Sequence, residues 1–411
     1  MKYLLIIGDG MADDKIPSLG GKTPIEAAQK PFLDSLAARG TLGSVRTIPE
    51  GFPPGSDTAI MSIFGCDPRK CYSGRAPLEL AAAGRILPAG AAAYRCNMAT
   101  LEEGELPFGE RRILSHSAGS IEAAESDALV TALFEHPDFA PLAERAGLEV
   151  LPGHSFRHLA LQRDAELDGI RLAPPHDHLG EACGALLPSG CKNAAVLREL
   201  MEKSFVILSK HPINAQRRAE GKLPANCVWF WAEGRGATLP SFVEAYGAEG
   251  GVISAVPLCH GIARLVGLSP VSVPGATGEW DTDYEAKLAA ALEVLETRDF
   301  AAIHLEGPDE ATHNHDLPHK IYSVECLSER VAKKLCAELS ARGEDFRLLI
   351  LSDHLTLMAN GAHDGRPVPF ILYDSREREK GSGLPYTEEN GGKGPFVDAG
   401  VKLMPLLFEK L

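Results

Sequence analysis

The sequence lacks the features that mark membrane, secreted and nucleic-acid-binding proteins. No hydrophobic run approaches the roughly 20 residues that a membrane-spanning helix needs. The apolar run near the N-terminus, Tyr3–Ile7, is shorter than the roughly 7–15 apolar residues of a secretory signal. The formal net charge is −15 and no basic stripe occurs, which argues against a nucleic-acid partner. We therefore expect a cytoplasmic protein that binds neither membranes nor nucleic acids, and no pattern in the sequence indicates its oligomeric state.

Cysteine pairs of the metal-binding or redox type are also missing. The nine cysteines are scattered, and the closest two, Cys66 and Cys71, do not form a C-x2-C pair. This spacing argues against a zinc knuckle or a disulfide framework and favours reduced thiols. A phosphate-binding P-loop is absent as well. Gly20-Gly21-Lys22-Thr23 resembles the end of such a loop, but Ile16 stands where its first glycine belongs.

The pattern of apolar residues predicts an α/β protein. With 411 residues, 45% of them hydrophobic and 24% charged, the chain is long enough for two globular domains. Strands and helices alternate in the first and last parts of the chain, as in an open sheet covered by helices. The strands predicted there are 2–7, 252–256, 271–273, 301–305, 346–351 and 369–372, and the helices are 32–39, 58–64, 284–297 and 320–340. The middle is less regular, and its predicted strands are 149–151, 158–162 and 205–208.

Three aspartates, Asp9, Asp309 and Asp353, each follow a short apolar run. In an open parallel sheet, residues just past the strand ends line the ligand crevice. Because these aspartates must meet there, the first and last parts of the chain should form one domain. We predict a discontinuous domain of residues 1–110 plus 251–411, with residues 111–250 as an inserted domain.

Histidines accompany two of these aspartates. His313 lies four residues after Asp309, His354 directly follows Asp353, and His363 lies ten residues after Asp353. In a helical turn, Asp309 and His313 share one face and can bind one ion, although an ordinary surface helix shows the same spacing. Carboxylates and imidazoles gathered from distant parts of the chain indicate a two-metal hydrolase or transferase centre.

Ser56 is the candidate nucleophile. It follows a loop, residues 49–55, that contains three prolines and two glycines, and it precedes the helix predicted at 58–64. A serine hydroxyl is inert at neutral pH unless a base or a metal ion lowers its pKa. A helix N-terminus would also help to hold phosphoryl oxygens. The alternative is that Ser56 only caps the helix, which is a common role for serine.

Candidate substrate contacts lie in the middle of the chain. Arg157 and Arg217 can each bind a phosphate or carboxylate in bidentate fashion, and Asn214 belongs to the same segment as Arg217. Surface salt bridges would explain both arginines equally well. His176, in His176-Asp177-His178, is interpreted as a loop contact near substrate, because no third metal ligand follows nearby.

Short segments spread along the whole chain match the sequence motifs of one protein family. They are Gly8-Asp9-Gly10-Met11, Pro54-Gly55-Ser56-Asp57-Thr58-Ala59, Gly74-Arg75-Ala76-Pro77-Leu78-Glu79, Arg95-Cys96-Asn97, Pro224-Ala225-Asn226, Gly275-Ala276-Thr277-Gly278, Pro308-Asp309-Glu310 with His313, Ser352-Asp353-His354, and His363 before Pro367-Val368-Pro369-Phe370. With these segments the chain resembles the cofactor-independent phosphoglycerate mutases of the archaeal type, within the alkaline phosphatase superfamily.

The resemblance implies a fold, a metal centre and a reaction. The fold would be an alkaline-phosphatase-like, doubly wound mixed sheet with an inserted smaller α+β domain. Seven residues would bind two divalent ions: Asp9, Ser56, Asp353 and His354 the first, and Asp309, His313 and His363 the second. Manganese is expected, with zinc, magnesium or cobalt as alternatives, and 2,3-bisphosphoglycerate is not needed.

The substrate implied by the resemblance is a small phosphorylated acid, 3-phosphoglycerate. Ser56 would accept its phosphoryl group as a phosphoserine and return that group to the 2-hydroxyl of the same glycerate. The inserted domain would exclude water and would provide the substrate contacts Arg157, Arg217, Asn214 and His176.

Two departures from the family pattern concern the substrate. Ile60 stands where the family commonly has Asn or His, and Asp364 follows His363 where Thr or Ser is usual. Residues 229–235 and 304–308 are similar to a bacterial subgroup proposed to be homoserine kinases. A phosphotransferase that acts on homoserine is therefore the alternative within the same fold. The third hypothesis is a binding protein without catalytic activity, and the intact metal ligands argue against it.

Overall fold

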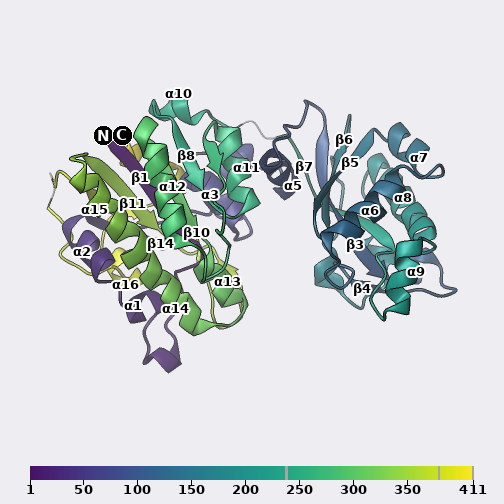
Figure 1. Cartoon of the computed structure of the whole chain (residues 1–411), viewed down its shortest axis with the longest axis horizontal. Helices are drawn as coiled ribbons and strands as arrows, with labels where there is room; N and C mark the ends of the chain where they lie inside the picture. The colour runs from purple at the N-terminus through teal and green to yellow at the C-terminus, as the bar shows by residue number, and fades with distance from the viewer. Residues whose placement is uncertain (237–238, 378–379, 410–411) are drawn as a thin grey trace. The chain divides into compact units, whose positions relative to one another are not determined.

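The computed structural model describes residues 1–236, 239–377 and 380–409. The chain divides into two compact units, which Figure 1 shows. Unit 1 comprises Met1–Tyr72 and Thr238–Leu411, and unit 2 comprises Ser73–Ala237. These boundaries differ from the predicted 111 and 250. Unit 2 begins earlier than predicted because β3 (Ala92–Leu101) pairs with β6 (Arg157–Gln162) and β7 (Cys227–Arg235), a long-range pairing that local sequence does not reveal.

Unit 1 contains the strands β1 (Lys2–Gly8), β2 (Thr41–Val45), β8 (Gly250–Ile253), β9 (Ser269–Val271), β10 (Phe300–Leu305), β11 (Phe346–Leu351), β12 (Leu355–Thr356), β13 (His363–Asp364), β14 (Val368–Asp374) and β15 (Phe396–Val397). Its helices are α1 (Pro24–Ala27), α2 (Pro31–Arg39), α3 (Ser56–Ile63), α4 (Pro68–Cys71), α10 (Phe242–Tyr246), α11 (Pro257–Val266), α12 (Tyr284–Thr297), α13 (Gly307–His313), α14 (Leu317–Cys326), α15 (Lys333–Ala341), α16 (Glu388–Gly391) and α17 (Leu403–Leu407). Short 3-10 turns occur at Pro17–Leu19 and Gly400–Lys402.

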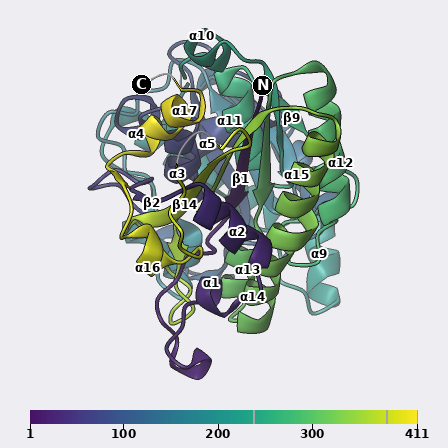
Figure 2. The same cartoon turned by 90° about the vertical axis from the view of Figure 1, so that its left-hand side faces the viewer.

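The central sheet of unit 1 has the strand order β15-β2-β14-β11-β1-β10-β8-β9. Strands β11, β1, β10, β8 and β9 are parallel, and β14 runs antiparallel to both of its neighbours. Helices cover both faces, with α12 and α15 on one side and α3 and α17 on the other (Figure 2). Because both faces are covered, the middle strands are almost continuously apolar, as in Phe300–Leu305. The predicted α/β fold with a mixed sheet is confirmed.

The helix predicted at 320–340 is interrupted. A π-helical turn, Leu327–Ala332, joins α14 to α15. Ser328 Oγ and Glu329 Oε1 in this turn accept hydrogen bonds from the backbone N–H groups of Leu33 and Phe32, at 3.3 and 3.2 Å. These groups lie at the N-terminus of α2, which has no capping side chain of its own. The π turn therefore supplies a cap that the sequence before α2 lacks.

Unit 2 contains the strands β3 (Ala92–Leu101), β4 (Ile113–Ser115), β5 (Leu148–His154), β6 (Arg157–Gln162) and β7 (Cys227–Arg235). Its helices are α5 (Arg75–Ala82), α6 (Ala123–Phe134), α7 (Ala140–Arg145), α8 (Lys192–Leu208) and α9 (Pro212–Ala219), with 3-10 turns at Phe108–Glu110, Pro175–His178 and Cys183–Leu186.

The sheet of unit 2 is antiparallel, with the order β4-β3-β6-β5 and β7 paired to β3. Its main core includes Leu129, Leu197 and Trp229, and a smaller cluster includes Ala76 and Leu80 of α5. The strand predicted at 205–208 is wrong, because these residues end the helix α8. Their apolar run belongs to a stripe with helical spacing that also buries residues 197, 200 and 201. Within the described ranges, no helix of either unit has the length and apolarity to cross a membrane.

Candidate metal centre

The carboxyl ends of adjacent parallel strands bring Asp9 and Asp353 together. Asp9 directly follows β1, Asp353 lies two residues after β11, and these two strands are neighbours in register. The backbone N–H of Gly10 donates to Asp353 Oδ1 at 3.0 Å, and the N–H of Asp9 donates to Leu305 O at 2.9 Å. Both residues are buried, with exposed fractions of 1% for Asp9 and 0% for Asp353. The predicted meeting of these distant residues is therefore present in unit 1.

Ser56 lies beside these carboxylates at the start of α3. Gly55 occupies the N-cap position, so Ser56 is the first helical residue and is not the cap. Its Oγ atom lies 3.1 Å from His354 Nε2 and 3.5 Å from Asp9 Oδ2. His354 Nε2 in turn lies 3.5 Å from Asp9 Oδ1 and 3.4 Å from Asp353 Oδ2. The hydroxyl, the imidazole and both carboxylates thus converge on one point.

The electrostatics of this group fit a divalent cation. Asp9 Oδ1 and Asp353 Oδ2 are buried oxygens without a hydrogen-bond partner. Burial raises the pKa of the Asp9 carboxyl well above its ordinary value, and the neighbouring Asp353 and Asp309 carboxylates raise it further. Unpaired buried carboxylates are costly unless a cation or a proton neutralises them. Two carboxylates, one imidazole and one hydroxyl form a donor set that a divalent ion can satisfy.

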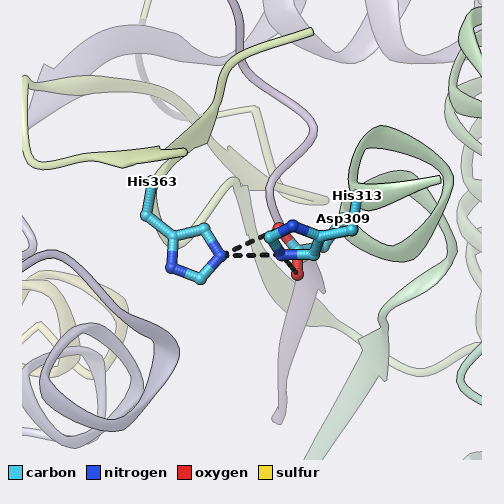
Figure 3. A group of neighbouring side chains, drawn as sticks. All are labelled: Asp309, His313 and His363. Atoms are coloured by element: carbon cyan, nitrogen blue, oxygen red, sulfur yellow. Dashed lines mark hydrogen bonds and ion pairs between the residues drawn. The ribbon is translucent and has the colours of Figure 1, made fainter. Parts of the chain in front are cut away.

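A second group of donors is formed by Asp309, His313 and His363 (Figure 3). Asp309 and His313 lie one turn apart on α13, and His313 Nε2 is 3.1 Å from Asp309 Oδ2. His363, on β13, places its Nε2 atom 3.5 Å from Asp309 Oδ1 and 3.0 Å from His313 Nε2. Two imidazole nitrogens so close together, and both facing one carboxylate, are arranged as metal ligands are.

The Asp309 carboxylate is suited to hold positive charge. Burial raises the pKa of this carboxyl, but hydrogen bonds from His313 and His363 outweigh that effect and the net shift is downward. Asp309 also offers an oxygen close to atoms of Asp9 and His354, with all three atoms within 4.8 Å of one another. The two groups of donors therefore form one continuous centre.

Two residues that contact this centre, Thr356 and His304, were not predicted from the sequence. Thr356 Oγ1 donates to Asp309 Oδ1 at 2.5 Å and lies 3.2 Å from His354 Nδ1, so it touches both groups of donors. His304, in the middle of apolar β10, places Nε2 2.9 Å from Asp9 Oδ2. A polar residue inside an apolar strand is unusual, and this could have drawn attention to His304. Nothing comparable distinguishes Thr356.

The predicted substrate contacts Arg157 and His176 lie in an aromatic cluster of unit 2. The Arg157 guanidinium lies 4.8 Å from the ring centre of Phe156, and the His176 ring lies 5.0 Å from that of Trp231. His116 contacts both Phe156 and His176. Burial lowers the pKa of His176, whose side chain is still 43% exposed. Both predicted residues are therefore accessible to a ligand.

The other two predicted contacts, Arg217 and Asn214, are buried within unit 2. Arg217 donates to Leu223 O, Ala118 O and the Glu125 carboxylate. Asn214 Nδ2 donates to two backbone carbonyl groups, and its Oδ1 accepts from the N–H of Ala225. Their hydrogen-bonding groups join α9 to neighbouring segments, which is a structural role. The guanidinium of Arg217 therefore finds its hydrogen-bond partners within unit 2.

The fold and this centre define a class of protein. A serine hydroxyl at a helix N-terminus, beside carboxylates and imidazoles at the strand ends of an α/β sheet, is an arrangement suited to metal-assisted phosphoryl transfer.

Comparisons with known proteins agree with this class. A family profile described as 2,3-bisphosphoglycerate-independent phosphoglycerate mutase matches residues 37–214. A probable enzyme of that name from Geobacter sulfurreducens is 40% identical over 100% of both chains, and one from Methanosarcina acetivorans is 42% identical over 96% of this chain and 95% of its own. Among solved structures, a protein from Pyrococcus horikoshii has a TM-score of 0.79 at 30% identity and covers 100% of this chain and 98% of its own. The cofactor-independent phosphoglycerate mutase from Thermoplasma acidophilum has the same fold, with a TM-score of 0.65 at 23% identity over 100% and 99% of the two chains.

The chain therefore belongs to the family of 2,3-bisphosphoglycerate-independent phosphoglycerate mutases. The resemblance inferred from the short motifs is confirmed over the whole length of the chain.

Proposed function

We propose that this protein interconverts 3-phosphoglycerate and 2-phosphoglycerate by passing the phosphoryl group through Ser56. The observation that carries the proposal is the place of the Ser56 hydroxyl, 3.1 Å from His354 Nε2 and 3.5 Å from Asp9 Oδ2 at the N-terminus of α3. The names of the relatives support phosphoglycerate as the substrate and the absence of a need for 2,3-bisphosphoglycerate.

Two divalent ions, manganese by preference, are part of the proposal. The ligands would be Asp9, Ser56, Asp353 and His354 for one ion, and Asp309, His313 and His363 for the other. Such ions, when bound, neutralise phosphoryl oxygens and lower the pKa of a coordinated hydroxyl.

The reaction would proceed in two displacements at one phosphorus atom. The Ser56 hydroxyl loses its proton and its oxygen attacks phosphorus, the bond from phosphorus to the C3 oxygen of the glycerate breaks, and that oxygen takes a proton. The C2 hydroxyl of the same glycerate then loses its proton and attacks the phosphoserine, and the Ser56 oxygen leaves and takes up a proton. The backbone N–H groups of Ser56 and Asp57, the first two residues of α3, would hold the phosphoryl oxygens during both steps, whereas that of Thr58 donates to Asp57 Oδ1.

Unit 2 would contribute to substrate binding. Arg157 and His176 are exposed next to aromatic rings, where a guanidinium and an imidazole can pair with carboxylate or phosphate oxygens. Replacing Arg157 by Gln should raise KM by about 10–100-fold, the value of one charge-assisted contact, with a smaller effect on kcat. Arg145→Gln is the matched control, since Arg145 is an exposed arginine at the end of α7. Equal KM values for the two variants would remove Arg157 from the proposal.

The decisive experiment is to incubate the protein with Mn²⁺ and 3-phosphoglycerate and to follow 2-phosphoglycerate by nuclear magnetic resonance. Ser56→Ala should abolish the transfer while most of the bound metal remains, because six other ligands are unchanged. Ser62→Ala is the control, since Ser62 is a buried serine at the other end of the same helix. Mutase activity retained in Ser56→Ala would eliminate the phosphoserine.

The same preparation separates the alternatives. No turnover of 3-phosphoglycerate, together with phosphorylation of homoserine, would favour the homoserine phosphotransferase. The buried Ile60, on α3 close to Ser56, is the residue that raised this alternative. A protein without bound metal or activity on any phosphomonoester would be the silent binding protein. We also propose a cytosolic location, because all nine cysteines are free thiols.

A further inference from the structure

A row of polar groups runs along the carboxyl ends of three adjacent parallel strands. Asp9 follows β1, His304 is the fifth residue of β10, and Ser254 follows β8. The strands β1, β10 and β8 are neighbours in the sheet, with Ile7 opposite His304 and Ile303 opposite Ile253. All three polar residues are buried, with 1–2% of each exposed. Buried polar groups in such a row must satisfy one another.

One assignment of donors and acceptors satisfies the neutral side chains of the row. The backbone N–H of Val256 donates to Ser254 Oγ at 2.9 Å, so the Ser254 hydroxyl proton is available for a further partner. In this assignment the partner is His304 Nδ1, at 3.1 Å. If Nδ1 accepts, the proton of the neutral imidazole lies on Nε2. Nε2 is 2.9 Å from Asp9 Oδ2, and it then donates to this carboxylate oxygen.

The hydrogen bond from His304 fixes one oxygen of the Asp9 carboxylate and leaves the other oxygen without a hydrogen-bond partner. Oδ2 accepts from His304, whereas Oδ1 is buried without a hydrogen-bond partner and lies 3.5 Å from His354 Nε2. A carboxylate fixed at one oxygen cannot rotate freely, so the other oxygen keeps its direction toward the metal centre. Partners of this kind, outside the ligands themselves, strongly affect metal affinity in other proteins.

We propose that Ser254 and His304 form a positioning relay that orients Asp9 for the first metal ion. The relay rests on the proposed two-ion centre, but it does not depend on which substrate that centre serves. His304 acts through Asp9 and has no ligand role, because both of its ring nitrogens already have partners in the sheet. Ser254 acts one step further away, by holding the His304 ring in the tautomer that donates to Asp9.

The test is the affinity for Mn²⁺ in the absence of substrate, measured by electron paramagnetic resonance and by calorimetry. His304→Leu should lower the affinity for one of the two Mn²⁺ ions by about 10–100-fold and leave the affinity for the other unchanged. His304→Gln should recover most of the affinity, because its amide keeps an N–H donor at the position of Nε2. Ser254→Ala should give an intermediate loss of about 3–10-fold, the effect of one neutral hydrogen bond.

The matched control is His158→Leu. His158 is also a fully buried histidine bonded to a serine, with Nε2 2.8 Å from Ser126 Oγ, but it belongs to unit 2. Its replacement should cost stability without changing Mn²⁺ affinity. Unchanged affinity in His304→Leu, or a Gln variant as weak as the Leu variant, would overturn the relay. If His304→Leu does not fold, Ser254→Ala decides, and parental affinity in that variant would overturn the relay.

Failure of the proposed function gives a different result. A parent protein that binds two Mn²⁺ ions but does not isomerise phosphoglycerate would refute the proposed mutase function. The Mn²⁺ affinities of the variants would still test the relay. A parent protein that binds both ions and is an active mutase, with variants of equal affinity, would refute only the relay.

Discussion

Gly10 is the residue whose replacement should separate backbone strain from damage to the metal centre. It has a φ of +57°, a conformation that costs an ordinary residue about 1–2 kcal/mol. An added Cβ would lie 2.4 Å from Thr356 Oγ1 and 2.5 Å from Asp309 Oδ1. Ordinary contact begins at 3.4 Å, so in Gly10→Ala these atoms must move by about 1 Å, the difference between 3.4 and 2.4 Å.

The displacement falls on a proposed metal ligand, Asp309, and this sets the size of the effect. Thr356 and Asp309 are both buried and hydrogen-bonded to each other, so neither can move aside alone. A misplacement of about 1 Å at a catalytic group can cost about 100-fold in rate. We expect Gly10→Ala to lose about 2–4 kcal/mol of stability, from strain and overpacking together, and about 100-fold in mutase activity.

Gly20→Ala is the control for this experiment. Gly20 also has a positive φ, +69°, but nothing lies within 4 Å of its added Cβ. This variant should lose about 1 kcal/mol, from strain alone, and keep full activity. Stability is measured by urea denaturation and activity by an enolase-coupled assay at saturating Mn²⁺. If Gly10→Ala were as active as Gly20→Ala, the close contact with Asp309 would have no catalytic importance.

Three further predictions concern ionisable side chains of unit 1. Asp309→Asn should lose one ion and most of the activity, as measured by metal analysis after gel filtration, and a variant that binds both ions normally would contradict the ligand assignment. The buried Asp13 carboxylate lies 2.7 Å from Lys320 Nζ. Lys320→Met should lower the free energy of unfolding, measured by urea denaturation, by about 3–5 kcal/mol, because it leaves this carboxylate without its cation. Adding Asp13→Asn should restore part of that loss, and no recovery would count against charge as the cause. Burial raises the pKa of Glu388 to about 7 from 4.5, so the folded state retains a proton that the unfolded state releases. Stability should therefore fall as pH rises from 4.5 to 7, and Glu388→Gln should be more stable than the parent at pH 8 by up to about 3 kcal/mol but similar at pH 4.5. Parallel stability curves for the two proteins would refute this origin.

The sequence alone indicated the residues that gather at the candidate metal centre better than it indicated their surroundings. Asp9, Asp309 and Asp353 stand out because each follows an apolar strand, and parallel strands end at one edge of a sheet. Their histidines stand out by spacing. The direction of each strand and its place in the order are long-range properties, but the need for these aspartates to meet was enough to indicate a discontinuous domain.

Other features depend on contacts that local sequence does not encode. Thr356 and Ser254 are ordinary residues until the fold places their hydroxyl groups next to Asp309 and His304. Arginine is a common anion-binding residue, yet Arg217 is buried and its guanidinium donates to two backbone carbonyl groups and to the Glu125 carboxylate of unit 2. The apolar run 205–208 has a length that suits either a strand or the end of a helix, and only packing decides between them.

The strand β1 lies in the centre of its sheet, between β10 and β11, although it is the first element of the chain. Its partners begin at Phe300 and Phe346, so a ribosome that has released β1 must add about 300 further residues before either partner exists. Unit 2, whose residues all lie between these segments, has the opportunity to complete its own core during that interval. A newly made apolar strand that waits so long for its neighbours is exposed to aggregation, and assembly of the candidate metal centre becomes one of the last events in the folding of the chain.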